Sequence, residues 1–153
     1  MENQQILDEL SRIEPRLDQF ALVAPSDTVA FCQQVLTSDA LPYIRANAIF
    51  LATLTASAPK AAELVQLGLA DEKFAVRVAA SRAIFLVAQR NSDFAVPLLR
   101  IALAIQDNGV RKFALKALKF VRDAPTRTQL LNLASEGADS FVSSTIAKLR
   151  AEQ

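Results

Sequence analysis

Cationic and aromatic side chains are the strongest candidates for chemistry in this sequence, because they fall into rows when its repeating segments are aligned. One row runs through Phe50, Arg82, Lys116 and Lys148, and a neighbouring row runs through Thr53, Phe85, Lys119 and Ala151. We predict that both rows point away from the core. A basic surface with interleaved aromatic rings attracts acidic protein segments, nucleic acid or anionic small molecules. The predicted binding residues are Phe50, Arg82, Phe85, Lys112, Lys116, Lys119 and Lys148.

Catalytic chemistry has little support, because the chain contains no histidine. It therefore cannot build a Ser-His-Asp or Cys-His centre, or the usual histidine-containing zinc sites. Gly68, Gly109 and Gly137 are too dispersed for a glycine-rich loop that binds phosphate. The adjacent carboxylates Asp8-Glu9 and Asp71-Glu72 are typical of a solvated turn or a helix start. We predict a protein that is not an enzyme, with no catalytic residue, no cofactor and no metal site.

Charge is distributed unevenly along the chain. Residues 2–75 contain ten acidic and five basic residues, a formal charge of −5, whereas residues 76–153 contain six acidic and twelve basic residues, a formal charge of +6. The formal net charge of +1 hides this separation. The separation favours a basic binding surface in the second half. The alternative is that Lys112, Lys116 and Lys119 only keep a helix solvated.

The elements that must position these residues are predicted to be helices. The chain has 153 residues, of which 52% are hydrophobic, so it can bury one sizeable core. It has only three glycines and is rich in alanine and leucine, which favours helices over a sheet. The predicted fold class is all-α.

An internal repeat organises these helices. Val76-Arg77 and Val110-Arg111 lie 34 residues apart, and Ile44-Arg45 lies 32 residues before the first pair. A weaker copy begins at Val142. Residues suited to helix starts recur every 33 or 34 residues, at Pro25, Pro59, Ser92 and Pro125. A period of this length is typical of a solenoid of stacked helix pairs.

Each repeat is predicted to contain two helices. The first helices are expected at residues 26–37, 60–69, 94–105 and 126–135, and the second helices at 41–57, 73–90, 109–122 and 140–151. The four repeats cover residues 25–58, 59–91, 92–124 and 125–153 in one continuous domain. We expect Pro97 either to delay or to kink the first helix of the third repeat.

Residues 1–24 form a predicted N-terminal capping helical segment. Its apolar stripe has helical spacing and consists of Ile6, Leu10, Ile13, Leu17 and Phe20. Pro15 predicts a bend, or a break into two helices, near Glu14. The polar face is acidic and therefore unsuited to anionic lipid, so we expect a cap and not a helix on a membrane surface.

The sequence also bears on location. No basic region followed by an apolar stretch opens it, and its longest uncharged stretch, residues 46–59, is shorter than the roughly 20 apolar residues of a membrane span. We expect a soluble cytoplasmic protein without a membrane partner. Cys32 is the only cysteine, which excludes an intrachain disulfide, and we expect it to be a small buried side chain.

Over about residues 25–150 the chain resembles HEAT-like repeat proteins, particularly the short PBS-lyase-type repeat, on an acidic turn followed by Val-Arg and an alanine-rich helix. The resemblance implies a right-handed α-solenoid of about four helix pairs whose second helices line a concave face. It also implies a structural ladder between neighbouring repeats, made by Asp39, Asp71 and Asp107 with Arg45, Arg77 and Arg111. The fourth repeat keeps Asp139 but has Ser143 in place of the arginine, which fits a terminal repeat.

Three functions are consistent with a basic concave face. The leading hypothesis is a non-enzymatic scaffold or adaptor that binds an acidic or amphipathic segment of a protein partner. The alternative is binding of a nucleic-acid backbone, which the near-neutral net charge disfavours. A third hypothesis comes from the resemblance: a bilin lyase-like subunit in which Phe50 or Phe85 stacks on the chromophore and basic residues pair with its propionates.

Overall fold

The computed structural model describes residues 2–12 and 15–152, and all regular structure in these ranges is helical. The all-α prediction is therefore confirmed for the described residues. The elements in chain order are α1 (Glu2–Leu10), α2 (Leu17–Ala21), α3 (Thr28–Leu36), α4 (Pro42–Thr55), α5 (Ala58–Leu69), α6 (Phe74–Arg90), α7 (Ser92–Ala104), α8 (Asn108–Ala114), the 3₁₀ helix η1 (Leu115–Phe120), α9 (Ala124–Ser135) and α10 (Ser140–Ala151).

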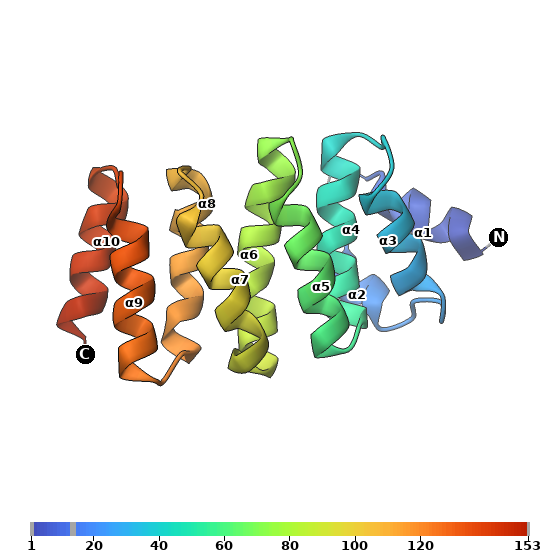
Figure 1. The fold of residues 1–153 in the computed structure, drawn as a ribbon. Helices are drawn as coiled ribbons and strands as arrows, with labels where there is room; N and C mark the ends of the chain where they lie inside the picture. Colours follow the sequence, from blue (N-terminus) through green and yellow to red (C-terminus); the bar gives the residue numbers. More distant parts are fainter. Residues whose placement is uncertain (1, 13–14, 153) are drawn as a thin grey trace.

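The helices are stacked in chain order. Figure 1 shows α1 at one end of the molecule and α10 at the other, with the two termini at opposite ends. Helices α3, α5, α7 and α9 contact one another successively, and so do α4, α6, α8 and α10. The molecule therefore has two layers of helices, and successive helices of the second layer lie side by side.

Short polar side chains and prolines determine where several helices begin. Asp107, Asp123 and Asp139 precede α8, α9 and α10, and each accepts a hydrogen bond from a backbone N–H in the first turn of its helix. Proline occupies the first turns of α4, α5 and α9, where its missing N–H costs nothing.

Small residues allow the two layers to approach closely. Gly68 is buried in α5, and a Cβ at this position would lie 2.4 Å from Cδ1 of Ile49 and 2.9 Å from Cβ of Ala80. Only a residue without a side chain fits between α4 and α6 at this point. Ala80 and Ala83 of α6 are fully buried in the same core.

The N-terminal segment contains two helices. Ile6 and Leu10 of α1 are fully buried, and Leu17 of α2 is also buried against the core. Pro15 lies between α1 and α2, so the segment is broken and not a single bent helix. The predicted stripe member Ile13 and the predicted break at Glu14 lie outside the described residues.

In the third repeat, one of the two alternatives predicted for Pro97 is excluded and the prediction for the second helix is corrected. Helix α7 already begins at Ser92 and continues through Pro97, so the proline does not delay the helix. The second helix is not a single α-helix over residues 109–122: α8 ends at Ala114 and the chain continues as η1 to Phe120. The 3₁₀ helix is narrower and rises more steeply than an α-helix.

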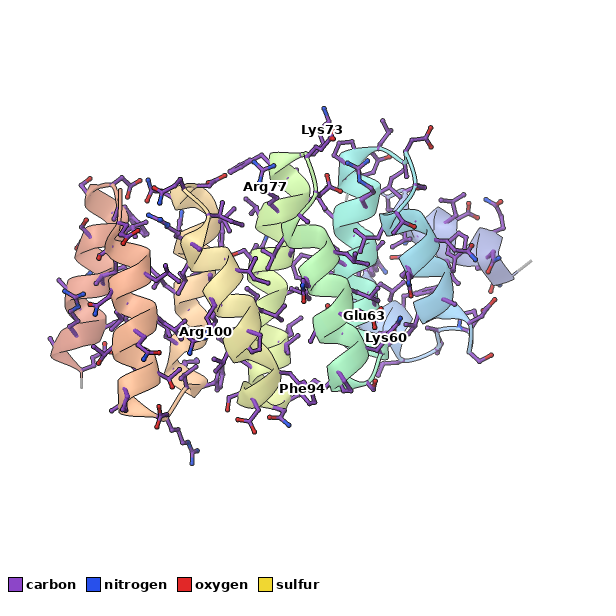
Figure 2. All side chains as sticks on the ribbon, in the orientation of Figure 1. Lys60, Glu63, Lys73, Arg77, Phe94 and Arg100 are labelled. Atoms are coloured by element: carbon purple, nitrogen blue, oxygen red, sulfur yellow. The ribbon has the colours of Figure 1, made fainter. Side chains whose placement is uncertain are left out.

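Arginines near the starts of the second helices reach forward to the next turn. Arg45 donates from Nε and Nη2 to the two carboxylate oxygens of Asp71, each at 3.0 Å. Nη2 of Arg77 lies 3.6 Å from Oδ2 of Asp107. Figure 2 shows Arg77 at the edge of the molecule where α6 begins. Each of these two pairs connects a second helix to the turn before the next second helix.

The last arginine of this series donates to backbone carbonyl oxygens and not to a carboxylate. Arg111 is fully buried and donates to the carbonyl oxygen of Leu103 at 3.1 Å and to that of Glu136. Asp139 instead caps its own helix. Arg45 is the first arginine of the series and pairs with the aspartate of the following turn, so no arginine of an earlier repeat is available for Asp39. The Asp39 carboxylate accepts no hydrogen bond from any described residue.

No helix within residues 2–12 and 15–152 combines the length and the apolar character needed to cross a bilayer.

Candidate functional site

The predicted binding residues lie on the helices of the second layer. Arg82, Lys112, Lys116, Lys119 and Lys148 are exposed, whereas Phe50 and Phe85 are half-buried. Phe50 comes from α4, Arg82 and Phe85 from α6, the next three lysines from α8 and η1, and Lys148 from α10.

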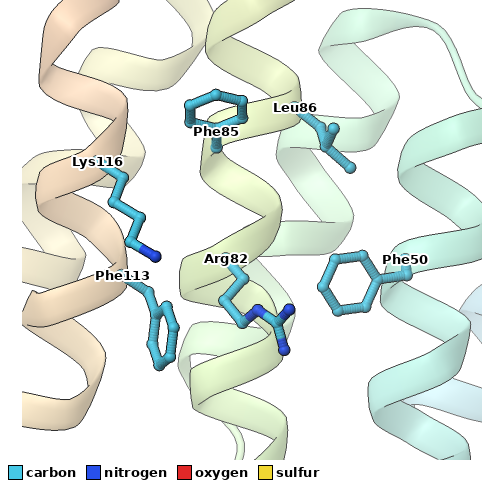
Figure 3. Close-up of a pocket in the computed structure, with 6 residues that line it drawn as sticks. All are labelled: Phe50, Arg82, Phe85, Leu86, Phe113 and Lys116. Atoms are coloured by element: carbon cyan, nitrogen blue, oxygen red, sulfur yellow. The ribbon is translucent and has the colours of Figure 1, made fainter.

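A shallow pocket brings four of these residues together. It has a volume of about 260 Å³ and is lined by Phe50, Arg82, Phe85, Leu86, Phe113 and Lys116. Figure 3 shows that the lining residues come from three neighbouring helical segments, with the central helix contributing Arg82, Phe85 and Leu86. The floor is aromatic and aliphatic, and both charges that line it are positive.

Arg82 occupies the centre of this site, between two phenylalanine rings. Its Cζ lies 5.5 Å from the centroid of the Phe50 ring and 5.4 Å from that of Phe113. A guanidinium is attracted to the negative face of an aromatic ring. The two rings therefore support the arginine head from neighbouring repeats while its N–H groups remain available (Figure 3).

Phe113 also attracts two lysines. Nζ of Lys112 lies 5.4 Å and Nζ of Lys116 lies 5.1 Å from the centroid of its ring. Lys112 also lies 5.1 Å from the ring centroid of Phe141 at the start of α10. Three cations, counting Arg82, thus surround one ring.

Lys119 belongs to a second aromatic cluster beside the pocket. Its Nζ lies 4.8 Å from the ring centroid of Phe85 and 5.2 Å from that of Phe120. The two rings contact each other edge to face, with centroids 5.1 Å apart and an interplanar angle of 72°. This contact joins α6 to η1 beside the pocket.

These cations are not paired with acidic side chains of the described residues. Among the residues that the structure describes, Arg82, Lys112, Lys116 and Lys119 form no ion pair, and their side chains donate no hydrogen bond. Buried arginines elsewhere have partners, as Arg45 and Arg111 do. The cationic heads therefore remain free to meet an anion from outside the chain.

Sequence reasoning missed the rings that complete the site and misplaced one neighbour. Phe113, Phe120 and Phe141 were not among the predicted residues; the position of Phe113 three residues before Lys116 is a signal that could have found it. Thr53 was predicted to point outward. It is instead buried, and its hydroxyl donates to the carbonyl oxygen of Ile49 at 2.7 Å. In the part of the chain described, Lys148 contacts no aromatic ring and lies outside the pocket.

Other groups offer little chemistry. No cluster of histidine, cysteine or carboxylate side chains within the described ranges could hold a metal ion. Cys32 is buried, and desolvation raises the pKa of its thiol to about 12, so the nucleophilic thiolate is scarce at neutral pH. The carboxylate of Asp71 is occupied by Arg45.

Comparisons with protein-family models, with curated proteins and with solved structures found no match to this chain. We call the group formed by Arg82, Lys112, Lys116 and Lys119 with the rings of Phe50, Phe85, Phe113, Phe120 and Phe141 the cation–aromatic face.

Proposed function

We propose that this chain is a non-enzymatic interaction module that binds an acidic, amphipathic segment of another protein on its cation–aromatic face. The observation that carries the proposal is the state of the four cations: each is stacked on a phenylalanine ring, and none meets an acidic side chain among the described residues. Complementary charge at such a face promotes association and selects against basic partners.

The aromatic rings give this face two binding components. Stacking restricts the cationic heads before a ligand arrives, which lowers the entropy cost of binding. Phe50, Leu86 and Phe113 provide an apolar floor that an aliphatic or aromatic side chain of the partner can cover. The pocket volume of about 260 Å³ suits such a side chain and falls below the roughly 300–1,000 Å³ of pockets that enclose whole small molecules.

The proposed architecture is a right-handed α-solenoid of four HEAT-like helix pairs at residues 25–153, preceded by a capping segment. Support comes from the two layers of successively contacting helices and from the forward pairs Arg45–Asp71 and Arg77–Asp107. In a solenoid the second helices form one extended surface. A linear segment of a partner can lie along such a surface without requiring a deep cleft.

Nucleic acid is the second candidate, and the alternation of cations with rings favours it. Single-stranded nucleic acid binds where bases stack on aromatic side chains beside basic groups. The formal net charge of +1 argues against it as the main ligand. Phosphate binding loses affinity steeply as salt rises, so a salt titration with a single-stranded oligonucleotide separates the two candidates. The pocket at the cation–aromatic face, with its volume of about 260 Å³, is smaller than the roughly 300–1,000 Å³ of pockets that enclose small molecules, which disfavours the bilin hypothesis at this site.

The test is a charge reversal compared with a control of equal charge. The double variant Arg82→Glu/Lys116→Glu is expected to weaken binding of an acidic leucine-containing peptide at least about tenfold in fluorescence anisotropy. The control is Arg100→Glu/Lys148→Glu, which changes the net charge equally at exposed positions outside the pocket. Equal losses in the two double variants would indicate unspecific attraction, and no loss in the first would remove the proposed site.

A further inference from the structure

The 3₁₀ helix η1 determines how the lysines of the cation–aromatic face are aligned. In an α-helix, two residues three apart differ by about 60° in direction and by about 4.5 Å along the axis. In a 3₁₀ helix, residues three apart are eclipsed and separated by about 6 Å. Lys116 and Lys119 both lie in η1, so the line that joins them runs parallel to the helix axis.

The distance of about 6 Å between the two lysines along the axis equals that between residues i and i+4 of an α-helix. Residues i and i+4 of an α-helix lie on one face and are separated by about 6 Å along the axis. Acidic side chains at i and i+4 of a partner helix therefore match Lys116 and Lys119 in their distance along the axis, and they diverge by only about 40° in direction. If this segment were α-helical, the two lysines would be only about 4.5 Å apart along the axis and would diverge by about 60°, so the match in spacing would be lost.

The structure holds η1 in this conformation from outside. Arg127 of α9 donates from Nη1 to the carbonyl oxygen of Leu118 and, at 3.3 Å, to that of Val121. Leu118 belongs to η1 and Val121 is the residue that follows it; the Leu118 carbonyl also accepts from the backbone N–H of Val121 at 3.0 Å. The side chains of Leu115 and Leu118, both in η1, are buried in the core. The alignment of the lysines is thus part of the packed structure.

A second line of contacts runs beside the lysines on α6. Arg82, Phe85 and Leu86 line the pocket from this helix. Axes of packed helices are separated by about 8–10 Å. A partner α-helix has a diameter of about 10–12 Å and can cover both lines with adjacent acidic and apolar stripes. The edge-to-face contact of Phe85 with Phe120 links α6 to η1 beneath such a partner helix.

We propose that the partner segment is an amphipathic α-helix that lies parallel to η1, with acidic residues at i and i+4 over Lys116 and Lys119 and apolar residues over Phe85 and Leu86. This inference rests on the proposed function and specifies the secondary structure and register of the ligand. The positions equivalent to Phe113 and Lys112 hold Ala79 and Val78 in the preceding repeat, so the repeat itself does not require this cluster.

Two peptides of about 16 residues with the same composition test the proposal. One has glutamates at i, i+4 and i+8 with an adjacent leucine stripe, and the other has glutamates at i, i+2 and i+4, the spacing of an extended segment. We expect the helical pattern to bind at least tenfold tighter in fluorescence anisotropy and to gain helical circular dichroism on binding. Equal affinity, or tighter binding of the extended pattern, would overturn the helix while leaving the acidic segment in place. If neither peptide binds, the proposed function fails as well.

A charge exchange tests the register. Lys119→Glu should weaken binding of the helical peptide about tenfold, and a peptide in which one glutamate is replaced by lysine should recover most of the loss. Recovery should depend on which glutamate is replaced, because only one lies over position 119. Lys148→Glu is the matched control, since it alters an exposed lysine that contacts no described ring. Equal recovery at every peptide position would overturn the assigned register.

Discussion

The arginines near the starts of the second helices, at the edge of the molecule where the turns lie, differ from the basic residues on the cation–aromatic face in what neutralises their charge. At the edge, Arg45 is paired with a carboxylate at 3.0 Å, and fully buried Arg111 is bound to backbone carbonyls. On the face, Lys116 and Lys119 are exposed, their ammonium groups lie near aromatic rings, and neither forms an ion pair with a described residue. The edge arginines therefore bind groups of the protein itself, whereas the charges of the face lysines are not neutralised by described residues.

This difference separates stability from binding. An arginine at the edge offers several donors in a rigid plane and can link a turn to a neighbouring helix. A lysine on a ring keeps its ammonium near the surface, where a ligand can reach it. Mutations at the edge should therefore change the free energy of unfolding, and mutations on the face should change affinity.

The largest expected effect follows from removing the buried arginine. Arg111→Ala should reduce the free energy of unfolding by about 3 kcal/mol, because it leaves a cavity and frees the carbonyls of Leu103 and Glu136. Urea unfolding followed by circular dichroism measures the loss. The control is Lys112→Ala. Lys112 is the exposed neighbour of Arg111, and its replacement should change the free energy of unfolding by less than about 0.5 kcal/mol. Similar losses in both variants would contradict the separation of edge and face.

A smaller effect is expected at Asp71, and it should depend on pH. Burial acts to raise the pKa of this carboxyl, but hydrogen bonds from Arg45 and from the backbone of Lys73, with the charges of Arg45 and Arg77, hold the pKa below its usual value. Asp71→Asn should cost about 1–2 kcal/mol near neutral pH.

The direction of the pH dependence follows from that lowered pKa. The unfolded chain binds a proton at Asp71 near pH 3.9, about where free aspartate titrates, while the folded chain resists it to lower pH. The stabilisation is therefore present above about pH 4 and is lost as the pH falls through the folded pKa. Urea unfolding of both proteins at several pH values should show the difference between wild type and Asp71→Asn shrinking in acid. A difference that is constant with pH would contradict the role of the charge.

The smallest effect concerns the ring that three cations share. Phe113→Leu keeps an apolar side chain but removes the aromatic face, so affinity for the helical acidic peptide should fall about threefold to fivefold. Isothermal titration calorimetry measures the change. Phe94→Leu alters an exposed ring on α7 that no described cation contacts, and it should leave the affinity unchanged. An unchanged affinity in Phe113→Leu would mean that stacking does not prepare the cations for binding.

Much of the helical framework could be predicted from local pattern. Seven of the eight repeat helices occur close to the predicted ranges, because capping aspartates, first-turn prolines and apolar spacing act over a few residues. The exception is the predicted helix at residues 109–122. Its second half is η1, and nothing in its own composition distinguishes LKALKF from an α-helical segment.

The candidate site was predictable only in part. Aligning the repeats placed Phe50, Arg82 and Lys116 on comparable positions, and these residues line one pocket. The same alignment placed Thr53 outward, although it is buried. Phe141 could not be found this way, since its contact with Lys112 depends on how two repeats are packed.

The sequence by itself determined the helical class and the separation of charge, because helix propensity, capping and charge count are properties of neighbouring residues. The tertiary structure decided which cations became free. Arg111 and Lys112 are adjacent in the chain, yet packing buries the first in backbone contacts and leaves the second exposed beside two rings. Glu136, which accepts from Arg111, and Phe141, which lies beside Lys112, both belong to the following repeat, so these contacts depend on how the layers pack and not on local sequence.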